Sequence, residues 1–116
     1  MAIPDPERTV ATEQIDAFCQ SRIPVELHDK VRLEHTVRGD AITIVERRPP
    51  WRAGLGPEWT SSDIARLRFD PESQLWSLDW KDSSDRWHPY EGVPPSADVA
   101  PLLAEIDADP TGIFWG

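Results

Sequence analysis

The stretch that most constrains the fold of this chain is residues 75–90, LWSLDWKDSSDRWHPY. Within it Trp76, Leu78 and Trp80 alternate with mostly polar residues, which is the period-two pattern of a strand with two unlike faces. The stretch also carries three of the six tryptophans of the chain. Large aromatic side chains need an apolar surface to pack against. We therefore expect the rest of the chain to fold against one face of this strand.

A hairpin is predicted upstream, where the period changes to two from about Lys30. Gly39 and Asp40 supply a two-residue turn with glycine in the first central position, as a type II′ turn requires. Closing the hairpin there pairs Arg38 with Ala41 and, further along, His35 with Ile44 and Leu33 with Glu46. Apolar side chains then meet on one face in most pairs, which supports this register.

A second hairpin is predicted from a third strand, residues 64–69, and the turn at residues 70–73. Closing this turn places Leu67 opposite Trp76. The same closure puts Arg66 and Arg68 on the other face, beside Ser77 and Asp79. A short fifth strand follows at residues 86–90.

Two amphipathic helices flank the strands, one near each end of the chain. Apolar residues recur at helical spacing in both, and these are Ala11, Ile15, Phe18 and Cys19, then Val99, Leu102, Leu103 and Ile106. A chain of 116 residues fits one domain. We predict an α+β fold in which a five-stranded antiparallel meander sheet is flanked by an N-terminal and a C-terminal helix. Its parts are a helix at about 6–21, the sheet at about 30–90, a helix at about 98–108 and an apolar tail at 110–116.

The net charge of −9 disfavours nucleic-acid partners, because a phosphate backbone would be repelled on average. Residues 22–68 nevertheless hold nine Lys and Arg against seven Asp and Glu, whereas residues 69–116 hold two against ten. A local basic patch is therefore compatible with an acidic chain. The single cysteine, Cys19, and the absence of a leader or a long apolar run predict a cytoplasmic protein with no membrane contact.

The candidate binding surface starts from the segment ERRPPW at residues 46–51 and the long Pro- and Gly-rich loop after it. Guanidinium groups bind carboxylates and phosphates bidentately and stack on aromatic rings. We expect a small non-enzymatic binding domain for an anionic ligand or an acidic peptide, formed by Arg47, Arg48, Trp51, Arg52, Trp59, Arg66 and Arg68. The competing interpretation is that these arginines pair with the acids of the chain while Trp51 covers an edge of the core.

The alternative function is a small enzyme with a His–carboxylate centre, and the best pair is His35 with Glu46. Nothing else supports catalysis, because the chain has no GxSxG, P-loop, GxGxxG or CxxC motif. We therefore assign no catalytic residue. The spacing of His28, His35 and His88 matches no metal-site pattern, so we expect neither a metal nor a cofactor.

The apolar end of the chain has two possible roles. Ile113, Phe114 and Trp115 either dock on their own sheet or on another copy, which would make a homodimer through the tail.

Several motifs in the same order resemble a known family. They are VRLE at 31–34, ERRPPW at 46–51, WSLDWKD at 76–82, RWHPY at 86–90 and DPTGIFWG at 109–116. The chain resembles the bacterial domain-of-unknown-function family DUF3024 from about Ile15 to its end. The resemblance implies a free-standing single-domain bacterial protein. It implies no activity, cofactor or role for any residue.

Overall fold

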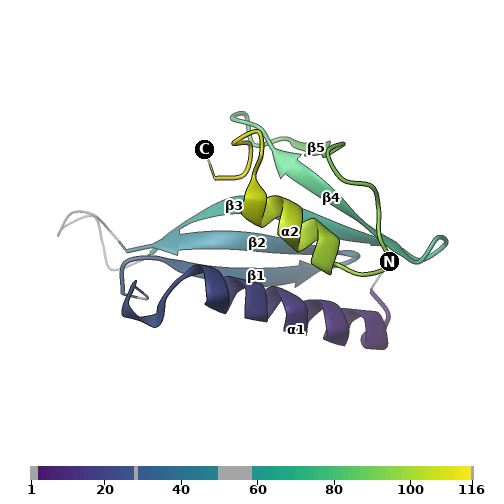
Figure 1. Cartoon of the computed structure of the whole chain (residues 1–116), viewed down its shortest axis with the longest axis horizontal. Coiled ribbons are helices and arrows are strands. Elements are labelled where there is room, and N and C mark those ends of the chain that lie inside the picture. The colour runs from purple at the N-terminus through teal and green to yellow at the C-terminus, as the bar shows by residue number, and fades with distance from the viewer. Residues whose placement is uncertain (1–2, 28, 50–58, 116) are drawn as a thin grey trace.

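One antiparallel sheet of five strands forms the centre of the structure, in the spatial order β1-β2-β3-β4-β5 (Figure 1). The computed structural model describes residues 3–27, 29–49 and 59–115. The strands are β1 (Arg32–Arg38), β2 (Ala41–Arg48), β3 (Thr60–Asp70), β4 (Leu75–Lys81) and β5 (Trp87–Pro89). The helices are α1 (Asp5–Arg22) and α2 (Ala100–Ala108), and a short 3-10 turn, η1 (Val25–Leu27), follows α1. The predicted α+β meander with a helix at each end is confirmed.

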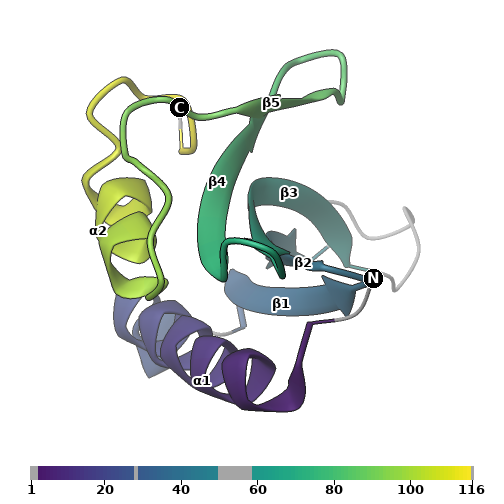
Figure 2. The same cartoon turned by 90° about the vertical axis from the view of Figure 1, so that its right-hand side faces the viewer.

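Both helices lie on the same side of the sheet, and the core lies between them and the strands (Figure 2). Alternate residues of the strands point toward the helices, and the helices turn their apolar stripes toward the sheet. Each fully buried aliphatic side chain contributes roughly 1.5–3 kcal/mol relative to an exposed one. The fully buried aliphatic residues include Ile15, Ile42, Ile44, Leu67, Leu102 and Ile106.

The β1–β2 hairpin has the predicted register. Arg38 pairs with Ala41, His35 with Ile44, and Leu33 with Glu46. Gly39 has a φ of 60°, the left-handed conformation that the first central position of a type II′ turn needs. The turn residues and the apolar pattern are both local signals, and both predict this register.

The predicted β3–β4 register is wrong by two residues. Leu67 pairs with Leu78, and Trp76 pairs with Phe69 instead of Leu67. The turn is longer than predicted because the Asp70 carboxylate accepts hydrogen bonds within it and Gln74 adopts a φ of 58°. A shift by an even number of residues leaves each side chain on its predicted face.

Strand β3 also begins earlier than predicted, at Thr60 instead of Ile64. It contains a β-bulge: Ala65 pairs with Ile44 and Asp63 with Val45, so Ile64 is the extra residue between them. A bulge bends the strand and increases its twist. The sheet is accordingly strongly twisted in Figure 2.

Strand β5 is short, and the connector after it completes the edge of β4. The backbone N–H of Tyr90 donates to the carbonyl of Leu78 (2.8 Å) at the end of β5. The backbone of Ser96 then exchanges two hydrogen bonds with Trp76, at 2.7 and 2.9 Å. The connector therefore runs along the edge of β4 on its way to α2.

The apolar tail lies against its own chain. Phe114 is buried, and its ring centroid is 5.1 Å from that of Tyr90. The indole Nε1 of Trp115 donates to the carbonyl of Ile106 (2.8 Å), and the Arg22 guanidinium lies over the indole at 3.9 Å. These contacts are intramolecular, so the homodimer through the tail stays a prediction.

Within the described ranges, neither helix has the length and the apolar character that crossing a membrane requires.

We predict that Asp109→Ala releases the tail. The Asp109 carboxylate accepts the backbone N–H groups of Phe114 (3.0 Å) and Trp115 (2.9 Å), at the residue that ends α2 in a left-handed conformation. Losing both bonds should lower the free energy of unfolding by about 1–3 kcal/mol, as measured by urea denaturation. Glu91→Ala removes an exposed acid and should leave it within about 0.5 kcal/mol. Equal effects of the two changes would contradict the prediction.

Candidate functional site

The structure divides the predicted binding surface between two faces of the sheet. Here the outer face means the sheet face turned away from α1 and α2. Strand alternation and the observed registers place Arg47, Arg66 and Arg68 on the outer face, and Arg48 on the helix-bearing face. Trp51 and Arg52 lie outside the described residues. The described residues therefore do not form one continuous surface from all the predicted side chains.

The two arginines at the end of β2 are engaged by acids of the same sheet. Arg47 Nη1 lies 3.3 Å from Glu34 Oε2, and Arg48 Nε lies 2.9 Å from Glu46 Oε1. Trp59 lies beneath the Arg32 guanidinium, 4.3 Å from the ring centroid. Arg47 and Arg48 therefore follow the competing interpretation, in which these arginines pair with acids of the chain.

A different centre forms around Asp79, in the middle of β4. This carboxylate is 1% exposed, and Arg66 Nε and Arg68 Nε both lie 2.9 Å from its Oδ2 atom. The contact follows from the register, because Arg66 is directly opposite Asp79 and Arg68 opposite Ser77. A buried carboxylate needs such partners, since an unpaired charge away from water is strongly disfavoured.

Arg66 and Arg68 also line a hollow of about 470 Å³ on the outer face. Both touch Asp79 through Nε, and among the described residues neither forms an ion pair with a second acid. Arg38 contributes a third guanidinium and makes no ion pair with a described residue. Other residues lining the hollow are Thr36, Asp40, Ala41, Thr43, Asp63 and Trp87.

Trp87 supplies an aromatic wall to this hollow. Its ring has the Arg66 guanidinium at 4.7 Å and the Lys81 ammonium at 5.5 Å from the centroid. Lys81 also pairs with Asp63 at 2.7 Å. Stacking on an indole and pairing with a carboxylate both restrict the positions of these cationic groups.

The charges at the hollow balance. Its lining holds three guanidinium groups against the carboxylates of Asp40 and Asp63. The buried Asp79 carboxylate, which pairs with two of these arginines, brings the sum to zero. Lys81, beside the hollow, is matched by Asp85, 3.8 Å away. The hollow is therefore less acidic than the chain as a whole, whose net charge is −9.

The predicted His35–Glu46 centre is wrong in its contacts. His35 Nδ1 lies 2.8 Å from Asp16 Oδ1 of α1, and Glu46 accepts from Arg48. The two residues are diagonal neighbours, as expected, but the side-chain partner of His35 is Asp16 and that of Glu46 is Arg48. Sequence spacing did not show that α1 brings Asp16 to the imidazole.

His88 forms a second His–carboxylate pair at the edge of the sheet. Its Nε2 lies 2.6 Å from Asp82 Oδ2, and its ring stacks on Trp80 at 4.7 Å. The hydrogen bond from His88, with the backbone N–H groups of Arg86 and Ser84, holds the pKa of Asp82 below its usual range. Across the described residues, no group of three His, Cys, Asp or Glu side chains is placed to hold a metal ion.

Sequence analysis missed Arg38 and Trp87 as lining residues of the hollow. It placed Arg66 and Arg68 beside Asp79 but did not predict that this carboxylate is buried. The signal was present in part. Arg38 pairs with Ala41, as predicted, and Ala41 pairs with Arg68. The β2–β3 register was not predicted, because the bulge at Ile64 and the long connection before β3 prevent its derivation from the sequence pattern.

Comparison with known proteins places the chain in one family. A family model described as a domain of unknown function (DUF3024) matches residues 3–116, and the chain belongs to this family. No curated protein matches the chain, and no solved structure does.

We predict that Asp79→Ala destabilises the fold by about 1–3 kcal/mol, because it leaves two partly buried guanidinium groups without their carboxylate. The estimate stays below the value for a fully buried pair because the Arg68 side chain is 46% exposed. Asp63→Ala removes a more exposed acid and should cost less than about 1 kcal/mol. Denaturant unfolding measures both, and an equal loss would show that Asp79 is an ordinary surface acid.

We also predict that Cys19 is unreactive in the folded protein. Burial, with the nearby charges of Asp16 and Glu34, raises the pKa of this thiol to about 11. Alkylation by iodoacetamide at pH 8 should be roughly 100-fold slower or more in the native than in the guanidinium-unfolded chain, because the thiolate is the reactive form. Comparable rates in the two states would contradict burial of the thiol, and Cys19→Ala provides the blank.

Proposed function

We propose that this chain is a small binding domain whose outer-face hollow takes a small organic anion with a carboxylate or phosphate group. The observation that carries the proposal is the Asp79 centre. One buried carboxylate orders two guanidinium groups beside a hollow that a third, Arg38, also lines. Guanidinium forks held in place in this way suit bidentate contact with an oxyanion.

The other residues of the hollow fit the same ligand. Thr36 and Thr43 add hydroxyl groups that can donate to an oxyanion, and Trp87 adds a flat apolar surface. An anion with an aromatic or apolar body would use both. A volume of about 470 Å³ lies within the roughly 300–1,000 Å³ typical of small-molecule sites.

A binding role is favoured over acid–base catalysis because the described imidazoles are on the other face. His35 contacts α1, and His88 stacks on Trp80, which packs against the core. Guanidinium and hydroxyl groups bind and orient an anion but exchange protons poorly near neutral pH. Two carboxylates, Asp40 and Asp63, also line the hollow, and Asp63 is already paired with Lys81.

The location proposed for this domain is the cytoplasm. The only cysteine of the chain, Cys19, is a buried free thiol. A protein without disulfides is compatible with a reducing compartment.

We predict that Arg38→Gln weakens anion binding about tenfold or more, because it removes a charge-assisted hydrogen bond worth roughly 1.5–3 kcal/mol. The probes are inorganic phosphate, phenyl phosphate and benzoate, measured by isothermal titration calorimetry on the full chain. Arg38 has no ion pair with a described residue, so its loss should leave the melting temperature nearly unchanged.

Arg86→Gln is the matched control. It removes the same charge from an exposed residue whose side chain does not line the hollow. If both variants weakened anion binding equally, the effect would come from the overall charge of the protein and not from a contact of Arg38 with the anion. If none of the three probes binds the unmodified chain, the anion site is refuted.

A further inference from the structure

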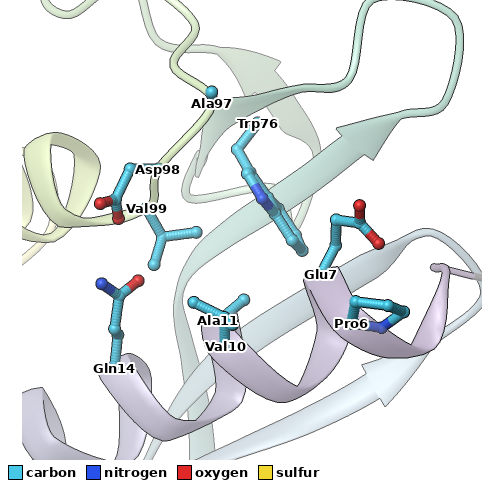
Figure 3. Close-up of a pocket in the computed structure, with 9 residues that line it drawn as sticks. All are labelled: Pro6, Glu7, Val10, Ala11, Gln14, Trp76, Ala97, Asp98 and Val99. Carbon is cyan, nitrogen blue, oxygen red and sulfur yellow. The ribbon is translucent and has the colours of Figure 1, made fainter.

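The hollow beside α1 differs in charge from the hollow on the outer face. It has a volume of about 280 Å³, and Trp76, Val99 and Glu7 are among the side chains around it (Figure 3). Its acids are Glu7 and Asp98, and no Lys, Arg or His is among its described lining residues. The outer-face hollow instead presents guanidinium groups and carboxylates together. A ligand in the outer-face hollow can therefore meet both signs of charge at once.

Two charged side chains of the outer-face hollow have no ion-pair partner among the described residues. They are Arg38, at the end of β1, and Asp40, in the turn that follows. The other charges of the lining are engaged, because Lys81 lies 2.7 Å from Asp63 and the remaining two arginines share Asp79. Two unpaired charges of opposite sign on one concave surface are satisfied together by a ligand that carries both a cation and an anion.

Cross-strand pairing brings these charges to the turn end of the hollow. Arg38 is directly opposite Ala41, and Ala41 is directly opposite Arg68. Because the side chain of Ala41 is a single methyl group, it leaves the space between the two arginines open. Asp40 precedes Ala41 in the chain and lines the same hollow. Two guanidinium groups, which suit a carboxylate, therefore lie near one carboxylate, which suits an ammonium group.

The other end of the hollow offers a surface for the body of the ligand. Trp87 lines it, and the Arg66 guanidinium lies 4.7 Å from the centroid of the indole ring. Thr43, the next residue of β2 on the outer face after Ala41, is opposite Arg66. A ligand whose charged groups lie over Ala41 therefore directs its body across Thr43 toward the indole. Aromatic groups pack favourably against such a ring.

We propose that the outer-face hollow binds a zwitterion, namely an aromatic α-amino acid. Its carboxylate pairs with Arg38 and Arg68, and its ammonium group pairs with Asp40. Its ring packs against Trp87. An α-amino acid carries both charged groups on one carbon atom, and it has no net charge for a chain of −9 to repel. The zwitterion site rests on the proposed function, because the carboxylate of the amino acid is the anion bound there.

Three probes with the same indole test this site on the full chain. They are tryptophan, 3-(indol-3-yl)propanoate, which lacks the ammonium group, and tryptamine, which lacks the carboxylate. Isothermal titration calorimetry should show tryptophan binding about tenfold or more tightly than either, because each omission forfeits a charge-assisted hydrogen bond. In ¹H–¹⁵N NMR spectra we expect shifts at the amides of Asp40 and Ala41 and at the Trp87 indole N–H, with residues 6–14 unchanged.

Asp40→Asn removes the charge and keeps a residue type that turns favour. It should weaken tryptophan binding about tenfold and leave 3-(indol-3-yl)propanoate bound no more weakly, so the ratio of the two affinities falls toward one. Asp29→Asn is the matched control. It changes the net charge equally, from an exposed position outside the hollow, and should leave that ratio unchanged.

Failure of the zwitterion site can be distinguished from failure of the anion site. If tryptophan and 3-(indol-3-yl)propanoate bound equally, or if both Asp variants changed their affinity ratio equally, the zwitterion would be overturned and the anion site would stand. Tryptamine binding as tightly as tryptophan would also overturn the zwitterion, because the carboxylate would then have no partner. If none of these probes bound, and neither phenyl phosphate nor benzoate did, both proposals would be refuted.

Discussion

Trp76 of β4 connects several parts of this fold. Its ring lies 5.1 Å from that of Phe69 and forms part of the core. Its backbone pairs with Ser96, which holds the connector before α2 against the sheet. The placement of α2, and with it Val99 and Asp98, depends on this pairing. The same indole also lines the hollow beside α1.

The two faces of the sheet use opposite chemistry. The helix-bearing face buries aliphatic and aromatic side chains, which stabilise the fold without directional requirements. The outer face instead centres on the buried Asp79 and its two arginines. Buried ion pairs often add little net stability compared with apolar residues of the same size. Removing Asp79 alone would leave Arg66 and Arg68 without their carboxylate, so the three side chains are stable only as a unit.

Local signals predicted much of this structure. The type II′ turn at Gly39 and the alternation beside it specified the first hairpin in full. The sheet face of Arg66 and Arg68 followed from the alternation of side chains along the strand alone. The same reasoning failed by two residues at the β3–β4 turn, since hydrogen bonds of the Asp70 side chain and the left-handed Gln74 decide its length. It also failed for His35, because the partner, Asp16, comes from a helix far away in the sequence.

The sequence by itself determined the α+β class, the order of the elements, the apolar faces of both helices and the family, because periodicity, turn residues and ordered motifs are all local properties. Only the tertiary structure decided which charges meet. The bulge at Ile64 sets the β2–β3 register and so brings Arg38, Ala41 and Arg68 into line. The antiparallel pairing of Ser96 with Trp76 places the connector along the edge of β4. The outer-face hollow is formed by residues from different strands, and contacts of that kind depend on long-range registers that no short stretch of sequence encodes.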